Sequence, residues 1–161
     1  MLVLLALVLA ACSPDAATDN VSTAPDLESA AIERGLVRDP DARSITGLYA
    51  RDTDRVCIVP DGGGHRIGAF VDYGDGIGCS ASGRASQAGE RLRIDLGDGC
   101  EFEARFDGER VTFPAIVPGA CARRCTRRAS LAALTTRRLS DSVSEGRAMR
   151  DGGNRLLCRT T

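Results

Sequence analysis

The chain has few of the side chains that several common kinds of protein need. Among 161 residues there are four phenylalanines, two tyrosines, one histidine and no tryptophan. A hydrophobic core must therefore come largely from Leu, Ile, Val and Ala. Binding of nucleic acid is disfavoured because few aromatic rings are present to stack on bases. A Ser–His–Asp triad would have to use His65, which stands in a glycine-rich turn.

The sequence also lacks an apolar run long enough to cross a bilayer as a helix. The longest run, residues 2–11, contains only Leu, Val and Ala, and a spanning helix needs about twenty apolar residues. Its length and its small final residues are typical of a secretory signal. The sequence "LAAC" at residues 9–12 resembles the lipobox of bacterial lipoproteins.

This resemblance implies that a signal peptide, residues 1–11, is removed before Cys12. The sulfur of Cys12 would then carry a diacylglycerol and its amino terminus an acyl chain, so the lipid bilayer is an expected partner. In this family an Asp after the cysteine retains the protein at the inner membrane. Ser13 holds that position here, which favours the outer membrane, with the protein facing the periplasm. No Arg or Lys stands between Met1 and the apolar run, although signals normally begin with positive charge.

The residues after the cysteine have the composition of a linker. Residues 13–26 are small and mostly polar, with no aromatic side chain, which is typical of a disordered segment. We therefore expect residues 12–25 to form a lipidated N-terminus and a flexible tether. Residues 26–161 are enough for a single domain with its own core.

Six cysteines follow Cys12, and an even number in an exported chain predicts three disulfides. Zinc is the competing interpretation for a C-x3-C pair, but no second close pair completes a tetrahedral site, so we expect no metal. Successive intervals of 22, 21 and 21 residues separate the first four cysteines. The first three should therefore lie on every second strand, roughly 10 Å apart in a flat sheet, which is too far for a disulfide. Their partners should lie across a curled sheet or in the C-terminal segment. The six are Cys57, Cys79, Cys100, Cys121, Cys125 and Cys158.

Alternation of apolar and polar residues predicts strands. The clearest case is residues 90–113, where Leu92 and Ile94 alternate with charged residues and Phe102 and Phe106 do the same after a Gly-Asp-Gly turn. Further strands are expected over 44–51, 55–60 and 65–73. Short helices are expected over 26–35, 128–138 and 142–150, although "LTTRRLS" at 134–140 could instead close a barrel as a strand. The pattern predicts a mainly β fold, a small antiparallel barrel or sandwich built as a meander, stapled by disulfides, with a helical C-terminal segment.

Positive charge is concentrated late in the chain. Residues 121–161 carry ten Arg against three acidic residues, a net charge of +7, while the whole chain carries −1. Arg123, Arg124, Arg127 and Arg128 recur at three and four residues, so a helix would align them on one side. Guanidinium groups suit phosphates and carboxylates, which makes an anionic envelope polymer or an acidic protein the expected partner. The alternative is that these arginines neutralise an acidic face of the same domain.

The sequence singles out no catalytic residue and implies no cofactor. The acidic turns at 72–76 and 95–99 lack the ligand spacing of an EF-hand calcium loop. The leading hypothesis is a non-enzymatic binding or inhibitory lipoprotein of the cell envelope. The alternatives are an envelope hydrolase that uses loop carboxylates and a structural component of an outer-membrane assembly.

Overall fold

The computed structural model describes residues 27–34, 36, 44–126 and 128–160. The chain divides into two compact units at residues 39 and 40. In the first unit, helix α1 covers Leu27–Glu33, within the range expected for a helix. The predicted signal peptide, the lipidation site Cys12 and the tether lie outside the described residues.

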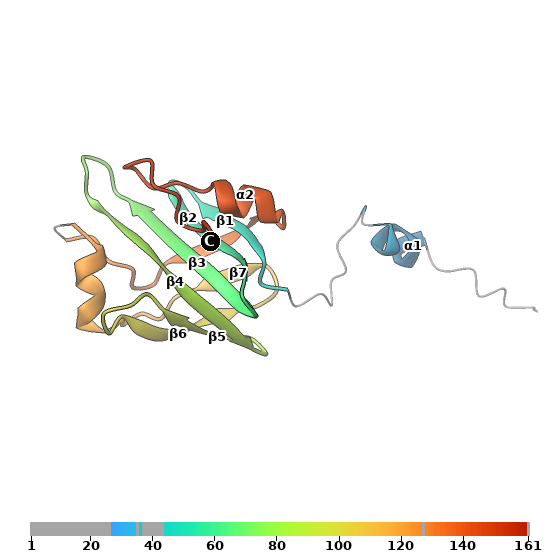
Figure 1. Cartoon of the computed structure of the whole chain (residues 1–161), viewed down its shortest axis with the longest axis horizontal. Helices are drawn as coiled ribbons and strands as arrows, with labels where there is room; N and C mark the ends of the chain where they lie inside the picture. Colours follow the sequence, from blue (N-terminus) through green and yellow to red (C-terminus); the bar gives the residue numbers. More distant parts are fainter. Residues whose placement is uncertain (1–26, 35, 37–43, 127, 161) are drawn as a thin grey trace, which may run out of the picture. The chain divides into compact units, whose positions relative to one another are not determined.

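The second unit is a closed antiparallel barrel in which each strand pairs with the next and β8 pairs back with β1 (Figure 1). This confirms the predicted mainly β meander, in its barrel form. Its strands are β1 Gly47–Arg51, β2 Asp54–Asp61, β3 Gly64–Asp72, β4 Gly78–Ala88, β5 Arg91–Asp95, β6 Glu101–Phe106, β7 Arg110–Thr112 and β8 Thr135–Ser140.

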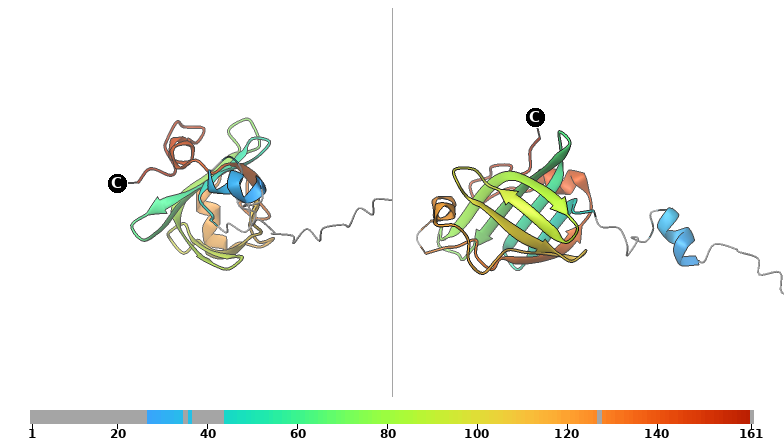
Figure 2. Two further views of the ribbon diagram at one scale, coloured as in Figure 1. Left: turned by 90° about the vertical axis from the view of Figure 1, so that its right-hand side faces the viewer. Right: turned by 90° about the horizontal axis from the view of Figure 1, so that it is seen from below.

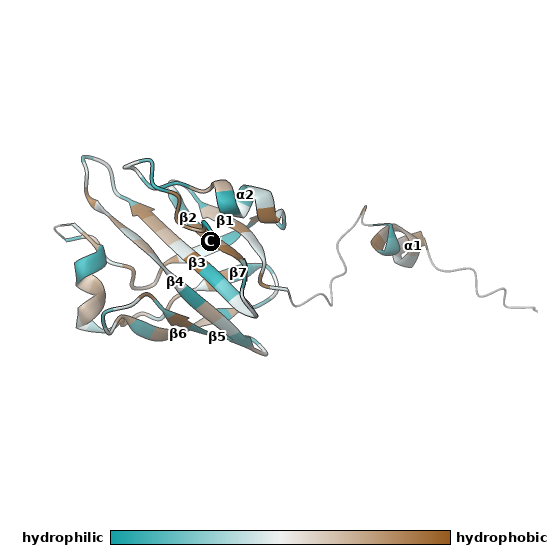
Figure 3. Ribbon diagram, in the orientation of Figure 1, coloured by the Kyte–Doolittle hydropathy of each residue, from teal (hydrophilic) through white to brown (hydrophobic). Residues whose placement is uncertain are grey.

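Side chains fill the barrel interior. Burial alternates strictly along β5 and β6, as the sequence predicts, and Figure 3 shows hydrophobic and hydrophilic residues interleaved along the strands. Four of the six aromatic rings lie inside, where Phe102 meets Phe113 at 4.9 Å between ring centroids and Tyr49 meets Phe106 at 6.2 Å. A ligand must therefore bind at a loop or on the outer surface.

A smaller apolar cluster lies outside the barrel wall. Strand β2 is buried on both faces, because Cys57 and Val59 pack outward against Met149, Leu157 and Cys158. Helix α2, Val143–Ala148, covers this side of the barrel (Figure 2). The Ser142 hydroxyl accepts a hydrogen bond from the Glu145 amide at 3.3 Å and so caps the N-terminus of the helix, which lies within the range 142–150 predicted to be helical.

The helix predicted over residues 128–138 is wrong. Strand β8 begins at Thr135, and the barrel closes through its pairing with β1 and β7. Burial along β8 is the reverse of what residue polarity predicts, since the apolar Leu139 is exposed while the polar Thr136 is fully buried. The alternative interpretation of this segment as a closing strand is confirmed.

The two ends of the barrel are closed differently. At the end where the chain enters, Arg138 lies over the rings of Tyr49 and Phe106, 4.8 and 5.4 Å from their centroids, and donates to the Ser44 carbonyl at 2.6 Å. We call the opposite end, which carries the β1–β2, β3–β4, β5–β6 and β7–β8 connections, the loop end. The 3₁₀ helix η1, Gly119–Arg124, lies there (orange in Figure 1).

Three disulfides fasten the segments that follow β7, and this confirms the disulfide prediction. Cys57 and Cys79 belong to β2 and β4, and Cys100 immediately precedes β6, so the three mark every second strand. None of them bonds to another, because each pairs with a later segment. The pairs are Cys57–Cys158, Cys79–Cys125 and Cys100–Cys121.

Candidate functional site

A cleft of about 840 Å³ lies at the loop end of the barrel. Three segments enclose it: the β3–β4 loop, residues 123–126 at the end of η1, and the C-terminal turn 151–155. Phe70 and Ser80, on β3 and β4, lie between them. The cleft is therefore built from parts of the chain that the barrel brings together.

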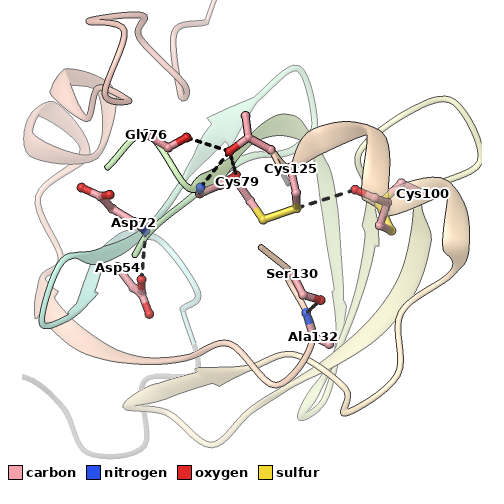
Figure 4. The surroundings of a disulfide bond; sticks show 11 residues. Asp54, Asp72, Gly76, Cys79, Cys100, Cys125, Ser130 and Ala132 are labelled. Atoms are coloured by element: carbon pink, nitrogen blue, oxygen red, sulfur yellow. Dashed lines mark hydrogen bonds between the residues drawn. A yellow bond between two sulfur atoms is a disulfide. The ribbon is translucent and has the colours of Figure 1, made fainter. Parts of the chain in front are cut away.

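Thr126 fixes the β3–β4 loop to the segment after η1. Its hydroxyl donates to the Gly76 carbonyl at 2.9 Å and accepts from the Gly78 amide at 3.0 Å. The adjacent Cys79–Cys125 disulfide joins the same two segments (Figure 4). One wall of the cleft is thus held both covalently and by hydrogen bonds.

Asp151 organises the C-terminal wall. Its side chain is only 3% exposed and accepts hydrogen bonds from the Ser80 hydroxyl at 2.7 Å, the Arg155 amide at 2.9 Å and the Arg155 Nε at 2.9 Å. Burial raises the pKa of this carboxyl, but those bonds and the Arg155 charge together bring the pKa below its ordinary value. Asp151 is consequently ionised at neutral pH and holds the turn against β4.

The groups of this cleft are not arranged for nucleophilic catalysis. The Ser80 hydroxyl donates its hydrogen bond to the Asp151 carboxylate. This carboxylate is a weak base, because the pKa of Asp151 is lowered. His65 pairs with Ala85, five positions from Ser80 along β4, so the two are separated by about 16 Å of strand. The single histidine therefore cannot activate this serine.

The predicted arginine helix is wrong, because η1 ends at Arg124 and Cys125 already has extended backbone. Arg124 binds the Asp98 carboxylate at 2.7 Å, and Arg123 donates to the Asp98 carbonyl. Arg128 is exposed, and Arg127 lies outside the described residues. Two of the four arginines thus brace the β5–β6 turn of the same domain, whereas anion binding by the group stays a prediction.

A second, smaller cleft of about 390 Å³ lies beside the β2–β3 turn. His65 lines it together with Arg84, Arg93, Asp61 and Asp95. Burial lowers the pKa of His65, so its imidazole is neutral at pH 7. Neutral imidazole can accept or donate a hydrogen bond there, but Ser80 lies outside this cleft.

The cysteines and acidic turns leave no assembled metal site in the described part of the chain. Cys121 and Cys125 belong to different disulfides, so the C-x3-C pair is not free to bind zinc. Across the described residues, no three His, Cys, Asp or Glu side chains come together as ligands. The described helices are also too short and polar for any of them to cross a membrane.

Comparison with known proteins gives no relative: no family model, curated protein or solved structure matches this chain.

Sequence reasoning missed the residues that hold the cleft together. Ser80, Thr126, Asp151 and Arg155 are far apart in the chain, and each stands in an ordinary polar turn or strand pattern. The only available signal was "DGGN" at 151–154, which indicates a turn but not its partner.

Proposed function

We propose that this chain is a non-enzymatic binding lipoprotein of the cell envelope, anchored through Cys12, whose loop end contacts a protein partner. The anchor follows from the lipobox, and Ser13 favours the outer membrane. Because β1 starts at the entry end of the barrel, the chain that leads back to Cys12 joins the barrel opposite the cleft. A partner bound at the loop end would meet the barrel at the end opposite this junction.

The observation that carries this proposal is the cleft at the loop end. Disulfides hold its loops in place, and side chains of both charges line it. A binding surface gains affinity when its loops are held in place before association, and here Cys79–Cys125 and Cys100–Cys121 hold them. Tyr73, on the β3–β4 loop, is 60% exposed, and exposed tyrosines are enriched where proteins associate.

The mixed charge favours a protein over a uniformly anionic polymer. Arg123, Arg124 and Arg155 line the cleft, but so do Asp72 and Asp75. A polyanion would be attracted by the arginines and repelled by the two carboxylates at the same surface. A folded partner can match both signs.

Photo-crosslinking in living cells tests the proposal. A photoreactive phenylalanine analogue replaces Tyr73 in one strain and Leu139 in another; both side chains are exposed, but Leu139 lies on β8, away from the cleft. We expect a discrete protein adduct from position 73 and none from 139. Equal labelling at both positions, or salt-sensitive co-sedimentation with purified peptidoglycan sacculi in place of an adduct, would contradict it.

A further inference from the structure

Two loops at the loop end share one sequence pattern, Asp-x-Gly-Asp-Gly, at residues 72–76 and 95–99. In each, the first Asp accepts a hydrogen bond from the amide of the first Gly at 2.8 Å. In each, the middle Asp has φ +52°, between two glycines of positive φ. The two loops therefore present the same backbone, carbonyl and carboxylate.

One of these loops holds arginine side chains. In loop 95–99, Arg124 donates to the Asp98 carboxylate at 2.7 Å and Arg123 donates to the Asp98 carbonyl. Gly97 makes room for this, since a Cβ there would lie 3.1 Å from an Arg124 nitrogen. Asp98, whose backbone is left-handed, offers a carbonyl oxygen and a carboxylate oxygen to guanidinium groups. The glycines on either side of it have no side chain that would block their approach.

In the other loop, no partner among the described residues holds the corresponding carboxylate. Asp75 is exposed and lines the cleft, and in the described part of the chain its carboxylate makes no hydrogen bond or ion pair. A Cβ added at Gly74 or Gly76 would meet nothing within 4 Å. Thr126 already fixes this loop through Gly76 and Gly78, so it needs no rearrangement to bind.

We propose that the Asp75 loop binds an arginine side chain of the protein partner, in the way that the Asp98 loop binds Arg123 and Arg124. This inference rests on the proposed function, because it takes the partner to be a protein. Arg124 and Arg155, which line the same cleft, are each paired with an aspartate of this chain, so their repulsion of an incoming guanidinium is reduced. Arg recognises the paired oxygens by its planar fork, which lysine lacks.

The direct test is an NMR titration of the folded chain with N-acetyl-arginine methylamide. We expect the Gly74 and Gly76 amide signals to shift, and the uncharged citrulline analogue to leave them unmoved. Asp75→Asn keeps a side chain that tolerates the left-handed backbone and should weaken binding by about tenfold or more. The control Asp52→Asn makes the same change at an exposed turn residue with φ +50° that does not line the cleft, and it should leave the titration unchanged.

Three results would overturn the inference. Unchanged titration of Asp75→Asn, in a variant that melts like the original, would show that the carboxylate is not the acceptor. Binding that appears only in Arg127→Gln would assign the loop to Arg127 of the same chain. An adduct from position 73 that persists at full yield in Asp75→Asn would remove this inference and leave the proposed function intact.

Discussion

At the scale of single residues, Asp151 joins the barrel to its C-terminal turn. The Ser80 hydroxyl on β4 and the amides of Gly153 and Arg155 all donate to its two oxygens. A buried carboxylate with this many donors stabilises the fold only in its ionised form. Its contribution must therefore depend on pH.

We expect Asp151→Asn to lose about 1–3 kcal/mol of unfolding free energy at pH 7. Because the pKa of Asp151 is lower in the folded protein, this stabilisation is present above the carboxyl's ordinary unfolded pKa, about 3.9. It disappears as the pH falls below that value through the folded pKa. Urea unfolding of both proteins at pH 7 and at pH 2–3 measures the difference.

Asp52→Asn is the matched control, since Asp52 is an exposed turn residue with φ +50° that asparagine tolerates. Its unfolding free energy should stay within about 0.5 kcal/mol of the original. A loss for Asp151→Asn that is the same size at both pH values would show that the charge is not what stabilises the turn.

At the scale of elements, η1 lies at the loop end of the barrel and is fixed to the β5–β6 turn. Cys121 is buried in the core and bonded to Cys100, while Arg123 and Arg124 bind the β5–β6 turn. Closing loops of 21, 46 and 101 residues stabilises a fold by roughly 3–5 kcal/mol per disulfide in the chain-entropy model. The disulfides thus fix η1 and the C-terminal turn, although the core contains few aromatic side chains.

We expect Arg123→Gln with Arg124→Gln to lower the unfolding free energy by about 1 kcal/mol, because both bonds to Asp98 are lost. Arg127→Gln with Arg128→Gln is the matched pair, with the same change of charge, and should melt like the original. Thermal melting of the two double variants, with binding to the partner measured alongside, separates bracing from recognition. Equal melting of the two pairs would refute the bracing role.

At the scale of the whole molecule, the two ends of the barrel differ in the groups that close them. The first residues of the barrel unit lie at the end that Arg138 closes, and the fastened loops lie at the other. The chain that leads back to the proposed lipidation site, Cys12, therefore joins the barrel at the end opposite the cleft.

We expect Cys12→Ala to leave the protein unlipidated, because the thiol that receives the diacylglycerol is gone. Detergent phase separation should then place the variant in the aqueous phase and the original in the detergent phase. Ser13→Ala is the control and should still partition with detergent. A Cys12→Ala protein that stays with the detergent would show that the anchor lies elsewhere.

The sequence by itself determined the strands whose apolar residues alternate and the short helix after residue 142, because each depends on neighbours within one element. The even number of cysteines after Cys12 also predicted the three disulfides. Tertiary structure alone decided strand β8, where Thr136 and Arg138 face the barrel and Leu139 faces solvent. Its hydrogen bonds come from β1 and β7, so its own residues could not decide between a helix and a closing strand. The cleft was undetermined for the same reason: Ser80, Thr126 and Asp151 meet only because the closed barrel and its disulfides bring distant segments together.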